Sequence, residues 1–316
     1  MSVAFADLTN DIRQRSSIAA EDVLALRRLV WGDQSVSREE ADALMALNTA
    51  CRLQATEWVD YFVEVMVDYL VHQETPEGYV DDAKSAWLMG WIDKDGAVNS
   101  LTELELLVKV METAESVPAA LRDYSLKQIE AAVLTGQGAT RNGFNDGDGR
   151  LDATCINATE VELLRRMIFA QSGDDAYIVS TAEADMLFRL KDATLGANNA
   201  PTWPDLFVKA VGNHLMAHRN YETLSREDKL RMDAYEADTT VSIGRFFRRM
   251  VGREGAALSP AALSIADKMN DDAAAAVDHA ITPQETQWTL DHIRADGHYD
   301  PVEKALVAFI RKEMMA

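Results

Sequence analysis

Residues 58–84 read WVDYFVEVMVDYLVHQETPEGYVDDAK, and residues 203–229 read WPDLFVKAVGNHLMAHRNYETLSREDK. The two stretches align without gaps at an offset of 145, and the alignment continues to Asp93 and Asp238. Eight of its 36 positions are identical, where composition alone would give roughly two. Farther upstream the two halves match again, with DVLALRRLVW (22–31) over EVELLRRMIF (160–169) and SREEADAL (37–44) over STAEADML (180–187). We therefore expect a tandem duplication.

Both copies have the residue pattern of helices. Large apolar residues recur at i, i+3, i+4 and i+7, which is one face of a helix. The expected buried stripes are Trp58, Tyr61, Phe62, Val65, Met66, Tyr69 and Leu70, and in the second copy Trp203, Leu206, Phe207, Ala210, Val211, His214 and Leu215. Capping-box spacing at Ser37–Glu40 and Asn157–Glu160 marks helix starts, and Ser225–Asp228 is a looser version. No segment shows the alternation that a strand needs, so the predicted fold class is all-α.

The chain is expected to fall into three parts. Residues 1–136 form the first helical half and residues 137–255 the second, which opens with the Gly/Asp-rich linker 137–152. Residues 256–316 form a C-terminal helical unit, and its last part resembles the end of the first half. This unit is therefore predicted to be a partial third copy.

Composition limits the classes of function. The 316 residues include 52 Asp and Glu against 31 Lys and Arg, a formal charge of −21. This excess would repel phosphate, so neither nucleic acid nor an anionic membrane surface is expected as a partner. Two cysteines are too few for a disulfide scaffold. The sequence has no signal peptide pattern, and no apolar run approaches 18 residues, so we expect a cytoplasmic protein without membrane insertion.

A short acidic pattern recurs between the expected helices. It consists of an Asp, a Gly or polar residue, a hydrophobic residue, a polar residue and then a Glu that opens the next helix. Carboxylates on a tight glycine turn supply the oxygen ligands that Ca²⁺ prefers. The candidate metal ligands are Asp93, Asp95, Asn99 and Glu103 in one turn, Asp146, Asp148 and Asp152 in the linker, and Asp296, Asp300 and Glu303 near the C-terminus. Calcium is the expected ion.

The same residues also fit a purely structural interpretation. Asp and Gly are common turn residues, and the Glu would complete a capping box at the start of a helix. The spacing resembles the second half of an EF-hand loop, but each copy departs from that pattern. Only Glu303 stands at the correct distance for the closing ligand. Both interpretations, cation site and helix cap, stay open at this point.

The C-terminal turn also resembles a known family. Residues 293–306, IRADGHYDPVEKAL, are similar to the signature of the tellurite-resistance TerB-like helical family. Val30–Leu47 and Ile92–Met111 resemble weaker copies, so the similarity covers about a third of the chain. The resemblance implies an all-helical fold with acidic inter-helix sites for divalent metal. It places such sites at Asp296, Asp300 and Glu303, and less directly at Asp33, Glu40, Asp95 and Glu103.

The sequence has no phosphate-binding loop, dinucleotide fingerprint or nucleophile elbow. His214 and His218, four residues apart, are expected to lie in or beside the core. The main hypothesis is therefore a non-enzymatic interaction or regulatory protein with an unidentified protein partner and with divalent cation binding in one or two turns. The alternatives are a metal-dependent enzyme with a carboxylate site between the halves, and a structural acidic scaffold with vestigial turns. The oligomeric state stays open.

Overall fold

The computed structural model describes nine parts of the chain: residues 2–31, 35–51, 53–93, 98, 100–141, 154–170, 178–217, 283–294 and 299–314. The chain divides into two compact units. The first comprises Met1–Ala153 with Glu162–Tyr177, and the second comprises Thr154–Val161 with Ile178–Ala316.

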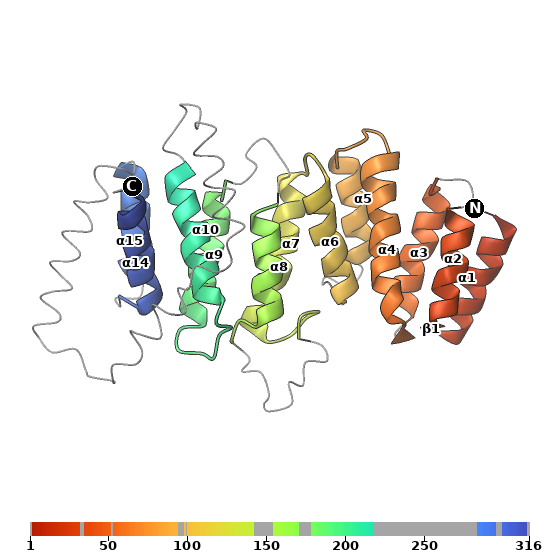
Figure 1. Cartoon of the computed structure of the whole chain (residues 1–316), viewed down its shortest axis with the longest axis horizontal. Coiled ribbons are helices and arrows are strands. Elements are labelled where there is room, and N and C mark those ends of the chain that lie inside the picture. The colour runs from red at the N-terminus through yellow and green to blue at the C-terminus, as the bar shows by residue number, and fades with distance from the viewer. Residues whose placement is uncertain are drawn as a thin grey trace, which may run out of the picture. The chain divides into compact units, whose positions relative to one another are not determined.

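The first unit consists of helices that pack on the next helix of the chain or on the next but one (Figure 1). Its elements are α1 Val3–Arg15, β1 Ser17–Ile18, α2 Ala20–Val30, α3 Arg38–Ala50, β2 Leu53–Gln54, α4 Thr56–Val67, the π-helical turn η1 Asp68–Gln73, α5 Asp82–Ile92, α6 Leu101–Thr113 and α7 Ala119–Thr135. Helix α4 lies at the centre, because it contacts α2, α3 and α6. Helix α8, Ala158–Ile168, follows the linker and begins in the second unit.

The predicted stripe of the first copy is confirmed. Its seven side chains, from Trp58 to Leu70, are all at most 1% exposed. The stripe continues through η1, where the backbone changes from α- to π-helical hydrogen bonding at Asp68 without exposing Tyr69. The core of this unit is therefore built around the most apolar helix of the first copy.

A small parallel strand pair is the one element of the described residues that the helical pattern did not predict. Ser17 pairs with Leu53 and Ile18 with Gln54. These residues lead into α2 and α4, and the N–H of Ala55 donates to the carbonyl of Ile18 at 2.9 Å. Two residues are too short a run to give a period-two pattern, so the sequence offers no signal for this pair.

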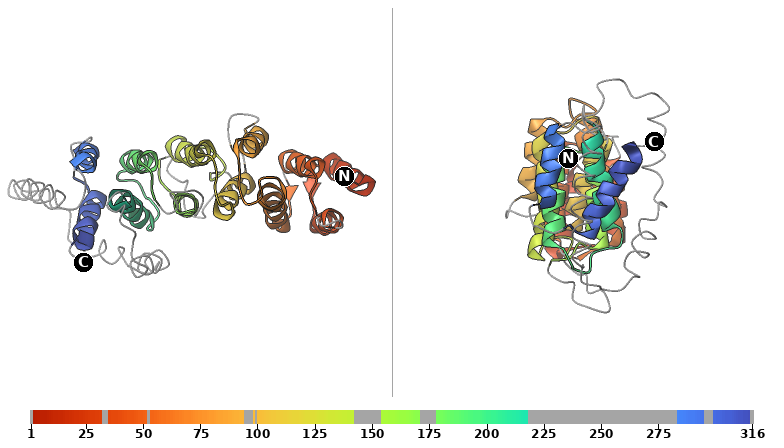
Figure 2. Two further views of the ribbon diagram at one scale, coloured as in Figure 1. Left: turned by 90° about the horizontal axis from the view of Figure 1, so that it is seen from above. Right: turned by 90° about the vertical axis from the view of Figure 1, so that its left-hand side faces the viewer.

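The second unit contains α9 Thr181–Ala193, α10 Trp203–Ala217, α14 Pro283–Arg294 and α15 Pro301–Met314. Figure 2 shows α14 and α15, in blue, beside the green α9 and α10. Helix α10 packs on both α9 and α15. Its predicted stripe, from Trp203 to Leu215, is buried, including His214 at 3% exposure.

The all-α fold class is thus confirmed for the described part of the chain. The predicted division into residues 1–136, 137–255 and 256–316 stays a prediction, because much of the two later parts lies outside the described residues. Within those same described residues, no helix combines the length and apolar character needed to cross a membrane.

Candidate functional site

Six helix starts share one local structure, and three of them close acidic turns predicted from the sequence, at Glu40, Glu103 and Glu303. In each, an acidic side chain at the third helical position accepts the backbone N–H of the N-cap residue. These acids are Asp22, Glu40, Glu103, Glu160, Glu183 and Glu303, and their N–H···O distances lie between 2.8 and 3.3 Å. All six are at most 8% exposed. This confirms the capping boxes predicted at Ser37 and Asn157; Ser225–Asp228 lies outside the described residues.

A second contact fixes a residue one or two positions before the N-cap at four of these helix starts. Its backbone N–H donates to an amide side chain that comes from 30 to 43 residues later in the chain. The four pairs are Val36 with Gln73, Val98 with Gln128, Ile156 with Asn199, and Val179 with Asn213. We call these contacts amide clamps. They tie each helix start to a neighbouring helix or loop, and the sequence analysis did not anticipate them.

Only part of the predicted metal ligands can be placed. Asp93, Glu103, Asp300 and Glu303 are described, whereas Asp95, Asn99, Asp146, Asp148, Asp152 and Asp296 lie outside the described residues, as does Asp33. Across the described ranges, no three His, Cys, Asp or Glu side chains are grouped so that they could hold a metal ion. The predicted linker turn is therefore not described at all, and the other two turns are described in part.

Glu103 accepts two hydrogen bonds within the first unit. One carboxylate oxygen accepts the N–H of Ser100 at 3.3 Å, and the other accepts the side-chain amide of Asn48 on α3 at 3.4 Å. Asn48 in turn accepts the indole N–H of Trp58 at 3.1 Å. Asp93, at the C-terminal end of α5, accepts the hydroxyl of Tyr124 at 3.5 Å. The structure therefore places Glu103 inside a buried polar contact between α3 and α6.

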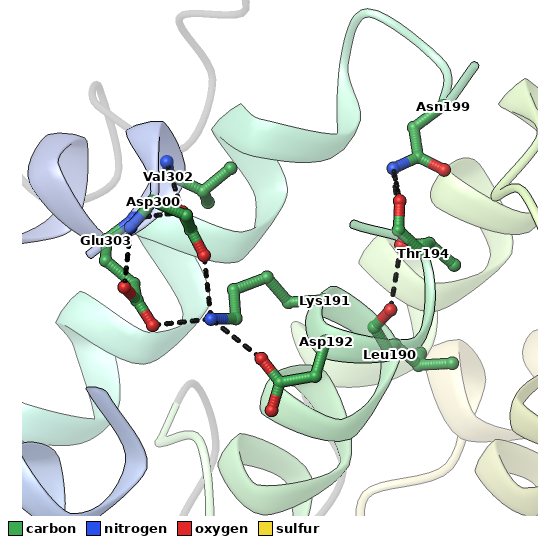
Figure 3. Close-up of polar contacts among 8 residues, drawn as sticks. All are labelled: Leu190, Lys191, Asp192, Thr194, Asn199, Asp300, Val302 and Glu303. Carbon is green, nitrogen blue, oxygen red and sulfur yellow. Dashed lines mark hydrogen bonds and ion pairs between the residues drawn. The ribbon is translucent and has the colours of Figure 1, made fainter. Parts of the chain in front are cut away.

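Asp300 and Glu303 meet a buried lysine from α9 (Figure 3). The ammonium of Lys191 lies 2.8 Å from Asp300 Oδ2 and 2.5 Å from Glu303 Oε1. A third carboxylate, Asp192, lies 2.8 Å away. The side chains of Lys191, Asp300 and Glu303 are 1%, 3% and 0% exposed, whereas Asp192 is 36% exposed. All three N–H donors of the ammonium thus face carboxylates.

The remaining oxygens of this cluster are occupied as well. Asp300 Oδ1 accepts the N–H groups of Val302 and Glu303 at 2.7 and 3.0 Å, and Glu303 Oε2 accepts the N–H of Asp300 at 3.0 Å. Every carboxylate oxygen of Asp300 and Glu303 therefore has a donor from the chain itself. The cation that these two residues hold in this structure is the lysine ammonium.

Burial and charge act on this cluster in opposite directions. Burial raises the pKa of Glu303 to about 7, although hydrogen bonds from Lys191 and from the Asp300 N–H favour the ionised form. For Lys191, burial by itself would lower the pKa, but hydrogen bonds to the three carboxylates outweigh it and raise the pKa above its usual value. The lysine therefore stays charged, and the pKa of Glu303 lies near neutral pH.

The sequence did not predict the role of Lys191, because its partners Asp300 and Glu303 lie 109 and 112 residues away. A local signal exists nevertheless. Lys191 follows Ala184 and Leu187 at helical spacing, so it occupies a position on the apolar face of α9, where both neighbours are fully buried. A lysine in a buried stripe requires a partner of opposite charge.

Two other cationic side chains are also held by groups of the chain. The ammonium of Lys84 donates to the carbonyls of Glu74, Pro76 and Tyr79, each at 2.7 Å, and Lys84 is 7% exposed. The guanidinium of Arg166 forms paired hydrogen bonds to two glutamates of α6, Glu105 and Glu112, at 2.7 to 3.0 Å. These cations hold loops and helices in place.

Aromatic residues dock on an aspartate in each unit. In the first unit, Trp87 and Trp91 of α5 donate their indole N–H groups to Asp42 of α3 at 3.0 and 2.8 Å. In the second unit, Trp288 of α14 donates to Asp185 of α9 at 2.9 Å. The ring nitrogen Nε2 of His292 lies 3.2 Å from the same Asp185 oxygen. Each aspartate therefore fixes a helix that packs beside it.

Comparison with known proteins found no relative. No family model matches the chain, and neither a curated protein nor a solved structure matches it.

Proposed function

We propose that this chain is a non-enzymatic, cytoplasmic interaction or regulatory protein of the TerB-like helical type, built from a duplicated helical plan. The observation that carries the proposal is the use of buried charge. Lys84, Arg166 and Lys191 are each bound by several oxygens of the chain. Charged groups committed to holding helices together favour a scaffold, since a catalytic site needs groups that can engage a substrate.

Two matched contacts support the duplicated plan. Asp42 and Asp185 occupy the same position of the match between residues 37–44 and 180–187, and each accepts an indole N–H from a later helix. Similarly, Glu103 and Glu303 both cap a helix while contacting α3 and α9, respectively. Equivalent contacts at matched positions are expected when one helical plan has been duplicated.

We further propose that a divalent cation binds at the turns of residues 93–99 and 146–152, and that this cation is calcium. Calcium takes six to eight oxygen ligands. Because both oxygens of Glu103 already have donors, Asp93, Asp95 and Asn99 would have to supply most of the ligands in the first turn. The linker turn would offer Asp146, Asp148 and Asp152. In this proposal, cation binding regulates the scaffold and plays no part in a reaction.

The test of cation binding is a calcium titration of chelator-treated protein by calorimetry, combined with thermal unfolding in calcium and in excess chelator. Binding to the folded state alone should stabilise it by about 2.7 kcal/mol at a hundred times the dissociation constant. Asp95→Asn together with Asp148→Asn should abolish the heat and the shift. Asp60→Asn, an exposed aspartate on α4, is the matched control and should change neither. Absence of heat and of a shift with calcium, magnesium, manganese and zinc would rule out cation regulation.

The interaction itself is tested by capture from native extract in calcium and in chelator. The expected result is a defined partner whose capture by the wild-type chain changes with calcium. The Asp95→Asn, Asp148→Asn variant should lose this calcium dependence. Equal capture by both proteins under both conditions would contradict regulation by the acidic turns.

A further inference from the structure

The two units contain docking faces with a common anchor. We call Asp42 and Asn48 of α3 the first docking face, and Asp185 and Lys191 of α9 the second docking face. The helix pair α5–α6 docks on the first face through Trp87, and α14–α15 docks on the second through Trp288. An indole N–H bound to an aspartate is common to both, so this contact cannot distinguish one helix pair from the other.

The second polar contact differs in charge. On the first face, the neutral amide of Asn48 meets one buried carboxylate, Glu103, whose helix has the neutral Ser100 as its N-cap. On the second face, the ammonium of Lys191 meets two buried carboxylates. Glu303 occupies the capping position that corresponds to Glu103, and the additional carboxylate, Asp300, stands at the N-cap.

A wrong pairing would leave buried charge without compensation. If α15 docked on the first face, Asp300 and Glu303 would be buried against the neutral Asn48. If α6 docked on the second face, Lys191 would keep one buried carboxylate instead of two. A buried charge that is left without its partner is strongly destabilising. The first mispairing leaves two such charges, so it carries the larger penalty. Charge that penalises the wrong partner is a common source of specificity.

We propose that Lys191 and Asp300 form a pairing determinant that directs the helix pair α14–α15 to α9 and prevents it from docking on α3. This inference rests on the duplicated plan proposed above, because exchange is a hazard only where two docking faces are alike. A glutamate at the third helical position is present in both arrangements, as Glu103 in α6 and Glu303 in α15. The discrimination therefore comes from the Lys191–Asp300 pair. The segment that separates the two helix pairs makes the choice consequential: Thr113 at the end of α6 and Pro283 at the start of α14 lie far apart in the sequence.

The test compares three full-length variants: Lys191→Asn, Asp300→Ser and the two together. The double variant reproduces the pair found in the first unit, Asn48 on the docking face and Ser100 at the N-cap of the helix that docks there. Hydrogen exchange of α14 and α15 measures docking. Lys191→Asn should speed exchange by about a hundredfold, because it leaves two buried carboxylates without a cation. Adding Asp300→Ser should slow exchange again by at least about tenfold, because only one carboxylate remains. A double variant that exchanges as fast as Lys191→Asn would overturn the proposal.

Refolding distinguishes a pairing determinant from an ordinary stabilising ion pair. After dilution from urea, wild-type protein should return to one species with one exchange population in α15. The double variant, whose two faces then match, should give more than one population or assemblies visible by light scattering. Asp192→Asn is the matched control, since Asp192 contacts the same ammonium from α9 itself, and it should refold as the wild type does. Homogeneous refolding of the double variant at every concentration would leave only a structural ion pair and overturn the proposal. A negative calcium titration would leave this result unaffected, so the two proposals fail separately.

Discussion

Gly212 of α10 lies directly against Phe309 of α15. A Cβ atom on Gly212 would lie 2.5 Å from Cε1 and 2.8 Å from Cδ1 of the Phe309 ring, which is closer than any real Cβ contact. The close packing of α10 on α15 therefore requires a glycine at this position. Gly212 is itself buried, between Val211 and Asn213 of α10.

The first prediction follows from this contact. Gly212→Ala should destabilise the second unit by about 1–3 kcal/mol, because the ring or the whole helix has to move to admit one methyl group. The measurement is urea unfolding together with hydrogen exchange of α15. Gly90→Ala on α5 is the matched control, because nothing lies within 4 Å of its added Cβ. That change should stabilise the protein by about 0.5–1 kcal/mol through helix propensity. If both substitutions stabilised the chain equally, the close contact at Gly212 would be disproved.

The second prediction concerns Lys84. Its ammonium donates to three backbone carbonyls of residues 74–79, at 2.7 Å each, and burial lowers its pKa. Lys84→Met keeps the apolar stem and removes the ammonium, so the three backbone carbonyls lose this donor. The expected loss is about 1–3 kcal/mol of unfolding free energy, with faster exchange at Tyr79 and Val80. Lys127→Met, an exposed lysine on α7, should change stability by less than about 0.5 kcal/mol. Similar losses in the two variants would show that the carbonyl contacts do not stabilise the loop.

The predictability of the fold differs between local and distant contacts. The stripe from Trp58 to Leu70 and the capping box at Ser37 follow from residues within a few turns of each other, and both could be predicted from the sequence. The role of Lys191 could not, because it depends on which helix packs beside α9 from more than a hundred residues away. The helix-cap interpretation of Glu103 and Glu303 was available from spacing alone. The second contact of each, with Asn48 or Lys191, required the structure.

The third prediction is a pH dependence of the second unit. Burial raises the pKa of Glu303 from 4.5 to about 7 in the folded protein. The folded state therefore binds a proton more tightly than the unfolded state does between these values. The stabilising contribution is fully present below about pH 4.5 and is lost as the pH rises through 7. Its size is on the order of 3 kcal/mol. Urea unfolding between pH 5 and pH 8, in chelator, measures it.

Glu303→Gln separates this effect from other titrations. The amide resembles the protonated acid in shape and cannot ionise, so the variant should lose the part of the slope that belongs to Glu303. An unchanged slope in Glu303→Gln would assign the pH dependence to other groups.

The fourth prediction tests the amide clamps. The side chain of Asn213 accepts the N–H of Val179 at 2.9 Å, and both residues are buried at 5% and 0% exposure. Asn213→Leu preserves volume and removes the acceptor, which leaves a buried N–H without a partner at a cost of about 1–3 kcal/mol. Exchange of the Val179 amide should accelerate accordingly. Gln128→Leu removes the corresponding clamp at Val98, where the bond is longer, 3.2 Å, and Gln128 is half-buried. Water can replace that acceptor, so this loss should be the smaller one. Equal losses in the two variants would mean that burial does not set the strength of a clamp, whereas no loss in either would show that the amide side chains do not hold the helix starts.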